Sequence, residues 1–233
     1  MPLRVLVTGA SRGFGAALSQ AFAERGARVF AGARGARPGL EAALARHPES
    51  LRAIELDVQS VTSIERARLE VAEHVDALDI VVNNAAIRSA TASNPISTID
   101  FDDVALTFDV NSIGPLRVTQ AFLPLLRGGV WPTLVNISSE AGSIGQSGRD
   151  REFDYCMSKA ALNMATRLMA NHLKGAARVF SLHPGWLRTD MGGAHAALDP
   201  LAAARESAAL IEREARNSDG PLFIDHSGVP LPW

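Results

Sequence analysis

The hydrophobic pattern of the chain alternates between short apolar runs and longer segments whose apolar residues recur at helical spacing. Seven runs rich in Val, Ile and Leu, without strict alternation, are typical of strands covered on both faces: 3–9, 27–32, 51–58, 78–85, 132–138, 178–185 and 220–225. Between these runs lie segments whose apolar residues recur at helical spacing, including 14–25, 60–75, 101–126 and 156–173. Strand, helix and strand repeated in this way predict an α/β fold with a doubly wound parallel sheet.

Length alone is compatible with one α/β domain or with two smaller ones, and the absence of a dividing linker favours one. The 233 residues, 47% of them hydrophobic, are enough for a full core. No linker rich in Pro, Gly or Ser divides the pattern, and no repeat or low-complexity segment is present. We therefore expect one domain over residues 1–233.

Charge and cysteine content exclude several classes of partner. A net charge of −2 provides no electrostatic footprint for nucleic acid or an anionic membrane. The only cysteine, Cys156, cannot form an internal disulfide and fits a reducing compartment. The first residues lack the features of a signal peptide, and no apolar run reaches the ~18 residues that span a bilayer. We expect a cytoplasmic protein with no membrane partner.

A glycine-rich turn, TGASRGFG (8–15), lies where the first predicted strand passes into the first predicted helix. Glycines let the backbone approach a pyrophosphate, and free N–H groups at a helix start bind the anion. The spacing of Gly9, Gly13 and Gly15 differs from the G-x-G-x-x-G dinucleotide pattern, however. Tight packing of strand against helix is therefore an alternative reason for these glycines.

A second pattern, YCMSK (155–159), contains the only tyrosine of the chain and one of its two lysines. Together with four further segments it resembles the short-chain dehydrogenase/reductase family, and all five occur in the family's order. The other four are the glycine-rich turn; Asn83-Asn84-Ala85-Ala86 with Asn111; Ser138-Ser139; and Pro184-Gly185 before Thr189. GSIG, SKAALNM, PGWLRTDMGG and the ending PLPW further resemble its C-factor and sniffer-type carbonyl reductase branch.

The resemblance covers essentially the whole chain and implies a single-domain Rossmann fold of about seven strands. It also implies an NADP(H)-dependent carbonyl reductase, reversible as an alcohol dehydrogenase, that acts on a small-molecule carbonyl or alcohol. The runner-up is a nucleotide-sensing or signalling protein of the C-factor type with little or no turnover. Helices 101–126 and 156–173 resemble those that pair between subunits in this family, so a homo-oligomer, dimer or tetramer, is expected.

Tyr155 is the expected acid/base of this reaction. Its pKa must fall from near 10 to about 7, and Lys159, one helical turn away, can stabilise the phenolate with help from an oxidised nicotinamide. The alternative is a buried tyrosine beside a surface lysine. The family pattern assigns Ser139 to the substrate oxygen, with Ser138 as its competitor. Asn111 would hold a water for a proton relay to Lys159, or else satisfy a helix irregularity before Pro115.

Two departures from the common family pattern are visible. Tyr155 follows Ser139 by sixteen positions, where most relatives have about a dozen, and the extra length falls in GSIGQSGRDREFD (142–154). Ala86 replaces a commoner glycine, which requires its backbone to avoid positive φ.

The segment after the second predicted strand predicts a preference for NADP(H). It lacks the acid that would hold the ribose hydroxyls of NAD, whereas Arg34 and Arg12 could bind a 2′-phosphate unless they are ordinary solvated arginines. Asp57 would meet the adenine amine or cap a helix. The resemblance implies a cofactor site made of Gly9, Ser11, Arg12, Gly13, Phe14, Gly15, Arg34, Asp57, Val58, Asn84, Ala85, Tyr155, Lys159, Pro184, Gly185, Leu187 and Thr189.

The substrate side is less clearly predicted. A mobile lid is expected at about 190–200. Ile144, Phe153 and Trp186 either wall an apolar pocket or serve ordinary packing. No ligand spacing joins His183 to His195, so no metal is assigned.

Overall fold

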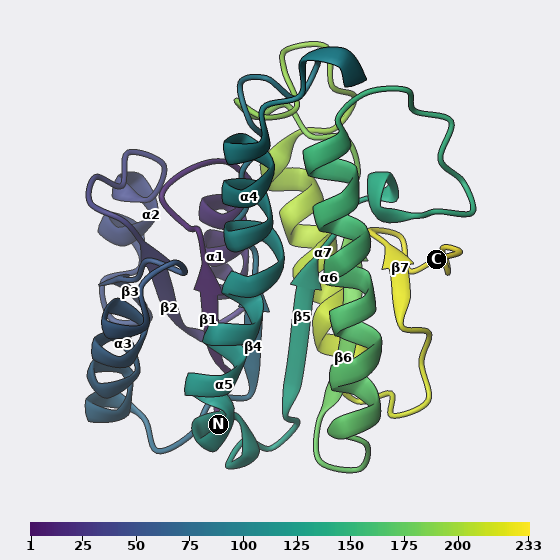
Figure 1. Ribbon diagram of the computed structural model, residues 1–233. Coiled ribbons are helices and arrows are strands. Elements are labelled where there is room, and N and C mark those ends of the chain that lie inside the picture. The colour runs from purple at the N-terminus through teal and green to yellow at the C-terminus, as the bar shows by residue number, and fades with distance from the viewer.

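The computed structural model describes all 233 residues and contains one seven-stranded sheet (Figure 1). The strands follow the order β3-β2-β1-β4-β5-β6-β7, and every neighbouring pair is parallel. The doubly wound α/β prediction is therefore confirmed. The bounds are β1 Arg4–Thr8, β2 Arg28–Ala33, β3 Leu51–Glu55, β4 Ile80–Asn83, β5 Thr133–Ile137, β6 Arg178–His183 and β7 Phe223–Asp225.

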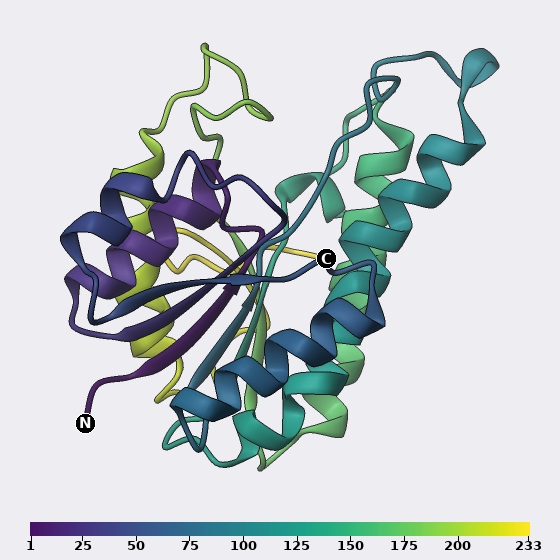
Figure 2. The same ribbon diagram turned by 90° about the vertical axis from the view of Figure 1, so that its left-hand side faces the viewer.

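Helices cover both faces of the sheet (Figure 2). One face carries α1 (Gly13–Glu24), α2 (Glu41–Arg46) and α7 (Pro200–Glu214), and the other α3 (Val61–His74), α4 (Phe101–Phe108), α5 (Gly114–Arg127) and α6 (Phe153–His172). Strands β1 to β6 contribute to a core on both sides: in β1, Val5 and Val7 join one cluster and Leu6 the other. This double burial explains why the apolar runs do not alternate.

The helices differ from the predicted segments in three respects. The segment 101–126 is not one α-helix, because a π-helical turn, Asp109–Ile113, separates α4 from α5. Helix α6 begins at Phe153, before the predicted start at 156, and α2 and α7 lie outside the segments named from the sequence. Asp199 caps α7, its side chain accepting hydrogen bonds from the N–H groups of Leu201 and Ala202. Two short 3₁₀ turns, Ile96–Thr98 and Glu140–Gly142, complete the helical structure.

The sheet brings the predicted site segments to one edge, because the carboxyl ends of parallel strands meet there. The order reverses at the β1/β4 pair, where connections leave to opposite faces. Across this pair Thr8 Oγ1 accepts hydrogen bonds from the N–H groups of Asn84 (3.0 Å) and Ala85 (3.1 Å). These bonds join the ends of β1 and β4 and shape the floor of a cleft. No helix is long and apolar enough to cross a membrane.

Candidate active site

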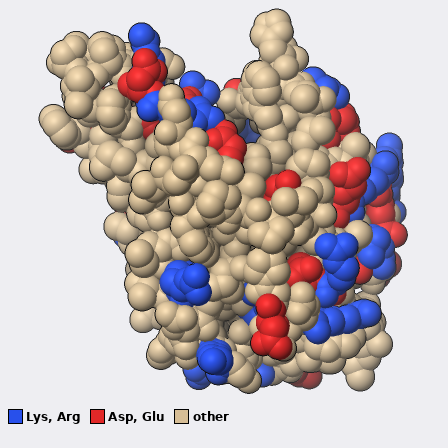
Figure 3. All heavy atoms as spheres, turned by 90° about the vertical axis from the view of Figure 1, so that its right-hand side faces the viewer, with Lys and Arg blue, Asp and Glu red and all other residues tan.

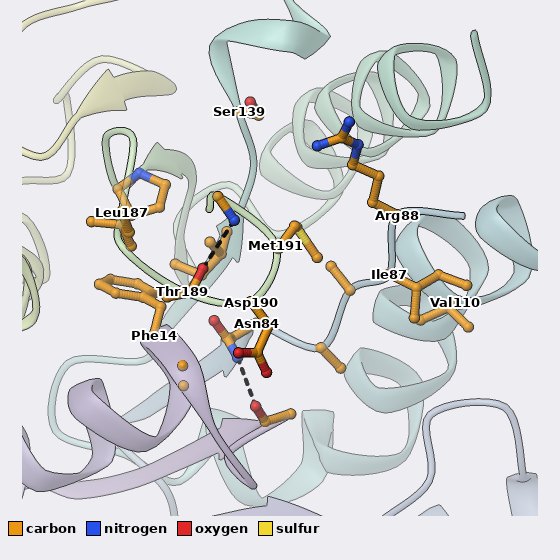
Figure 4. Close-up of a pocket in the computed structure, with 18 of the residues that line it drawn as sticks. Phe14, Asn84, Ile87, Arg88, Val110, Ser139, Leu187, Thr189, Asp190 and Met191 are labelled. Atoms are coloured by element: carbon orange, nitrogen blue, oxygen red, sulfur yellow. Dashed lines mark hydrogen bonds between the residues drawn. The ribbon is translucent and has the colours of Figure 1, made fainter. Parts of the chain in front are cut away.

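A cavity of about 970 Å³ opens at the carboxyl edge of the sheet (Figure 4). In the close-up, Phe14 and Asn84 lie at one end, and Ser139 and Arg88 at the other. Every residue expected to contact the cofactor lines this cavity: Gly9, Ser11, Arg12, Gly13, Phe14, Gly15, Arg34, Asp57, Val58, Asn84, Ala85, Tyr155, Lys159, Pro184, Gly185, Leu187 and Thr189. Of the four expected catalytic residues, Ser139, Tyr155 and Lys159 line it and Asn111 does not.

Different physical constraints require glycine at the three positions of the first turn. A Cβ on Gly9 would lie 2.5 Å from Ala85 Cα, and one on Gly15 would lie 2.3 Å from Asn84 Nδ2, so tight packing excludes a side chain at both. A Cβ on Gly13 would meet only Thr189, at 3.5 Å, but its φ of +58° favours glycine. No side chain caps α1 and no acid lies in its first turn, which leaves its N–H groups free for an anion.

The two candidate phosphate-binding arginines lie at the cavity with exposed guanidinium groups. Arg34 follows β2, and its Nη1 lies 3.8 Å from Asp57 Oδ2. Arg12 pairs with Asp190, Nη1 to Oδ2, at 2.9 Å. Asp57 does not cap α3, because that cap is the side chain of Ser60. Helix capping is therefore excluded as the reason for Asp57.

Tyr155 and Lys159 share one face of α6, with Lys159 Nζ 5.7 Å from the centre of the tyrosine ring. Nζ donates a 2.8 Å hydrogen bond to the backbone oxygen of Ile137, and the lysine is 2% exposed. This excludes a surface lysine. Burial lowers the pKa of Lys159 to about 8.

The pKa of Tyr155 moves in the direction opposite to the one expected from the sequence. Part of its side chain faces the cavity, yet protein surrounds the rest, and this burial raises the pKa to about 12. A hydrogen bond with Ser139 lowers the pKa, whereas the carboxylates of Glu140 and Glu152 raise it further. Loss of hydration disfavours the phenolate in the polypeptide alone, and the depression expected with Lys159 and an oxidised nicotinamide stays a prediction for the complex with the cofactor.

The two serines after β5 have different partners. Ser138 Oγ donates a 2.7 Å hydrogen bond to Asn163 Oδ1 and is 3% exposed. Ser139 Oγ accepts a bond from Ala141 N–H and also lies within hydrogen-bonding reach of Tyr155. Ser139 is therefore the serine that lies beside the tyrosine hydroxyl.

Asn111 lies in the π-helical turn, and its side chain contacts other segments. Its Oδ1 accepts a 2.8 Å bond from Ile87 N–H, and its Nδ2 donates to Ile87 O (2.8 Å) and Ser158 Oγ (3.0 Å). Ser158 Oγ in turn donates to the backbone oxygen of Tyr155. The helix irregularity exists, but Asn111 joins α6 to the chain after β4 rather than bonding its own turn.

A model of the short-chain dehydrogenase family matches residues 4–198 of this chain. The chain belongs to the short-chain dehydrogenase family. It is 38% identical to C-signal of Myxococcus xanthus over 157 residues, which cover 67% of this chain and 93% of that protein. Carbonyl reductase Sniffer of D. melanogaster superposes over all of both chains, with a TM-score of 0.91 and 27% identity. NADPH-bound carbonyl reductase from chicken fatty liver also covers both chains fully, at a TM-score of 0.88 and 30% identity.

The cavity of this short-chain dehydrogenase includes charged residues that the sequence analysis did not name: Arg88, Glu140, Arg149, Glu152 and Asp190. No local signal marks them, since each reaches the cavity through the packing of its loop. Two predicted pocket residues do not line it. Ile144 is 81% exposed, and Phe153 lines a separate, much smaller pocket, whereas Trp186 does line the cavity.

Two loops around this dehydrogenase's cavity have defined backbone geometry. Ala86 avoids the positive-φ region, as its replacement of glycine requires; only Glu152 among non-glycine residues has positive φ. The segment expected as a lid is irregular from Asp190 to Asp199, and α7 begins at Pro200. Trp186 Nε1 donates to Gly192 O at 2.9 Å, so the start of this segment is held beside the cavity.

Proposed function

We propose that this protein is an NADP(H)-dependent carbonyl reductase that also runs in reverse as an alcohol dehydrogenase. The observation that carries the proposal is the meeting of Ser139, Tyr155 and Lys159 at one end of a cavity whose other end holds the glycine-rich turn. The chain is an oxidoreductase by family, and the chicken carbonyl reductase it resembles was solved with NADPH bound. Its substrate would be a ketone, an aldehyde or the corresponding alcohol.

The cavity fits a phosphorylated dinucleotide. The uncapped start of α1 and Gly13 would hold the pyrophosphate, and Arg34 and Arg12 would hold the 2′-phosphate. Asp57 and Val58 would face the adenine, and Pro184, Gly185 and Thr189 the nicotinamide end. NADP(H), once bound, supplies or accepts the hydride.

Tyr155 would transfer the proton. With a pKa near 12 it is protonated at neutral pH, so it can donate its hydroxyl proton to the substrate oxygen during reduction. Ser139 would donate a hydrogen bond to the same oxygen and stabilise the developing charge. Lys159, buried beneath the tyrosine ring, would favour the phenolate that remains, and the positive charge of an oxidised nicotinamide would act in the same direction.

Replacing Tyr155 by Phe tests this proposal. Screening of ketones, aldehydes and quinones for NADPH consumption would first identify a substrate. Tyr155→Phe should then retain NADPH binding and lose about 10² or more in turnover, because the proton donor is gone. Ser138→Ala is the matched control for Ser139→Ala, since Ser138 bonds Asn163 and should tolerate the change better. Near-normal turnover of Tyr155→Phe would exclude Tyr155 as the acid.

A second candidate function is nucleotide sensing or signalling, which the identity to C-signal favours. Such a protein would bind NADPH and turn over none of the carbonyl compounds. The convergence of Ser139, Tyr155 and Lys159 supports the enzyme, because cofactor binding alone does not require a proton donor beside the nicotinamide site.

A homo-oligomer is part of the proposal. The outer surfaces of the 101–127 helical segment and α6 expose large apolar side chains, as an interface between copies would require: Phe101, Leu106, Ile113, Leu116, Met157, Met164 and Leu168. Pairing of these surfaces in a second copy would bury them, as expected for a symmetric dimer contact.

A further inference from the structure

The segment 143–152, between Ser139 and Tyr155, brings charged side chains to the catalytic end of the cavity. Arg149 forms ion pairs with both Glu140 and Glu152, and Glu152 also pairs with Arg88 Nη2 at 2.9 Å. All four side chains line the cavity. Figure 3 views the side of the molecule on which this segment lies, and acidic and basic atoms alternate beside the hollow at its top. We call the four residues Arg88, Glu140, Arg149 and Glu152 the ion-pair row.

The two carboxylates of the row, Glu140 and Glu152, lie between Ser139 and Tyr155 along the chain. Glu140 directly follows Ser139 and begins the 3₁₀ turn Glu140–Gly142. Glu152 precedes α6 by one residue, and its φ of 62° is the only positive value at a non-glycine residue. Its backbone N–H donates to Ala92 O at 2.8 Å, which helps hold this uncommon conformation. The chain therefore places Glu140 directly after Ser139 and Glu152 three residues before Tyr155, at the lining of the same cavity.

The two carboxylates do not depend equally on Arg149. Glu152 has Arg88 as a second partner, whereas Arg149 is the only cation that pairs with Glu140. Both acids raise the pKa of Tyr155. The ionisable or charged groups around this tyrosine, from its own helix and the elements packed against it, are Arg88, Glu140, Arg149, Glu152, Cys156, Lys159 and His183.

We propose that Arg149 is a positioning residue that holds and neutralises Glu140 beside Ser139 and Tyr155, and so sets the pH range over which the enzyme works. The proposal rests on the proposed function, in which Tyr155 carries the proton. Arg149 acts through the carboxylate and not on the substrate. Without the guanidinium, Glu140 would be an unpaired negative charge at the cavity that Tyr155 also lines, and it would oppose formation of the phenolate.

The single tyrosine of the chain allows a direct measurement. Tyrosinate absorbs in the near ultraviolet where tyrosine does not, so titration of the full protein with oxidised NADP bound reports Tyr155 alone. One unpaired charge within about 10 Å, at an effective dielectric constant of about 20, shifts a pKa by about one unit. Arg149→Gln should therefore raise the titration midpoint by about one pH unit. The acidic limb of the alcohol-oxidation profile should move upward by the same amount.

Arg151→Gln is the matched control. It removes the same charge from the same segment, but the Arg151 guanidinium bonds the backbone oxygen of Ser93 (3.1 Å) and forms no ion pair. This control should leave the midpoint within a few tenths of a pH unit of wild type.

Two further variants give the proposal its strongest test. Glu140→Gln in the Arg149→Gln background removes the unpaired charge and should return the midpoint close to wild type. Arg149→Lys keeps the charge without the forked contact and should shift the midpoint by less than Arg149→Gln. The proposal is wrong if Arg149→Gln and Arg151→Gln behave alike, or if Glu140→Gln restores nothing. The optical titration needs no turnover, so a fully active Tyr155→Phe protein would overturn the proposed function while this shift still decides the role of Arg149.

Discussion

Replacement of Arg34 by Ala should reveal how the cavity distinguishes NADPH from NADH. The Arg34 guanidinium is 60% exposed, lies 3.8 Å from Asp57, and makes one long hydrogen bond, 3.4 Å, to Gln59. It is thus near the expected 2′-phosphate position without a close carboxylate partner. Arg12 differs, because its 2.9 Å contact with Asp190 must be broken or shared when a phosphate binds.

The expected magnitudes follow from these contacts. A charge-assisted hydrogen bond contributes about 1.5–3 kcal/mol, and exposure to solvent places Arg34 at the lower end, or about tenfold in NADPH affinity. Arg12→Ala should lower the affinity for NADPH only a few-fold, because the contact with Asp190 offsets part of the attraction of Arg12 for phosphate. For the same reason Asp190→Asn should tighten NADPH binding. Neither substitution should change the affinity for NADH appreciably, because NADH has no 2′-phosphate.

Calorimetric dissociation constants for both cofactors provide the assay. Arg37→Ala is the matched control, since Arg37 pairs with Glu55 at 3.3 Å and does not line the cavity. Added salt should narrow the NADPH preference of the wild type by screening. Equal affinities in the wild type, or full discrimination by Arg34→Ala, would refute the reasoning. An aspartate at position 33 is a poorer test, because Ala33 is buried and a carboxylate there would destabilise the fold.

Two other predictions concern stability and assembly. The fall in the pKa of Lys159 from 10.5 to about 8 means that this group binds more protons in the unfolded state between these values. Stability should therefore rise with pH from about 8, until the raised pKa values of Cys156 and Tyr155 oppose the rise above about pH 9. Burial of the charged Lys159 costs about 3 kcal/mol of folding free energy at neutral pH. In urea denaturation at pH 7, Lys159→Met should therefore have a free energy of unfolding about 1–2 kcal/mol above wild type, because the Ile137 oxygen left without its donor offsets part of the gain. A lower free energy of unfolding would contradict this. Met164→Glu should convert the expected oligomer to a monomer by light scattering at micromolar concentration, whereas a monomeric wild type would contradict the proposed interface.

The seven strands and the parallel sheet were predictable from the sequence because their signals are local, whereas most of the predicted cavity lining came from the resemblance to the family. An apolar run buried on both faces is visible in consecutive residues, as in β1. The glycine-rich turn and the Tyr155–Lys159 spacing likewise depend on a few neighbouring positions. Parallel topology then brings the ends of β1, β4, β5 and β6 together without further information.

Only the tertiary structure decided the electrostatics of the site and the reasons for individual residues. Gly9 excludes a side chain because the backbone of Ala85, seventy-six positions later, would lie 2.5 Å from an added Cβ. The pKa of Tyr155 rises because burial outweighs the hydrogen bond with Ser139, and no spacing in the sequence reports how much water remains around a side chain. The pairing of Arg149 with Glu140 depends on the path of a loop, as does the exclusion of Ile144 from the cavity. Local backbone preferences act within a few residues, whereas burial and ion pairing depend on which distant segments finally pack together.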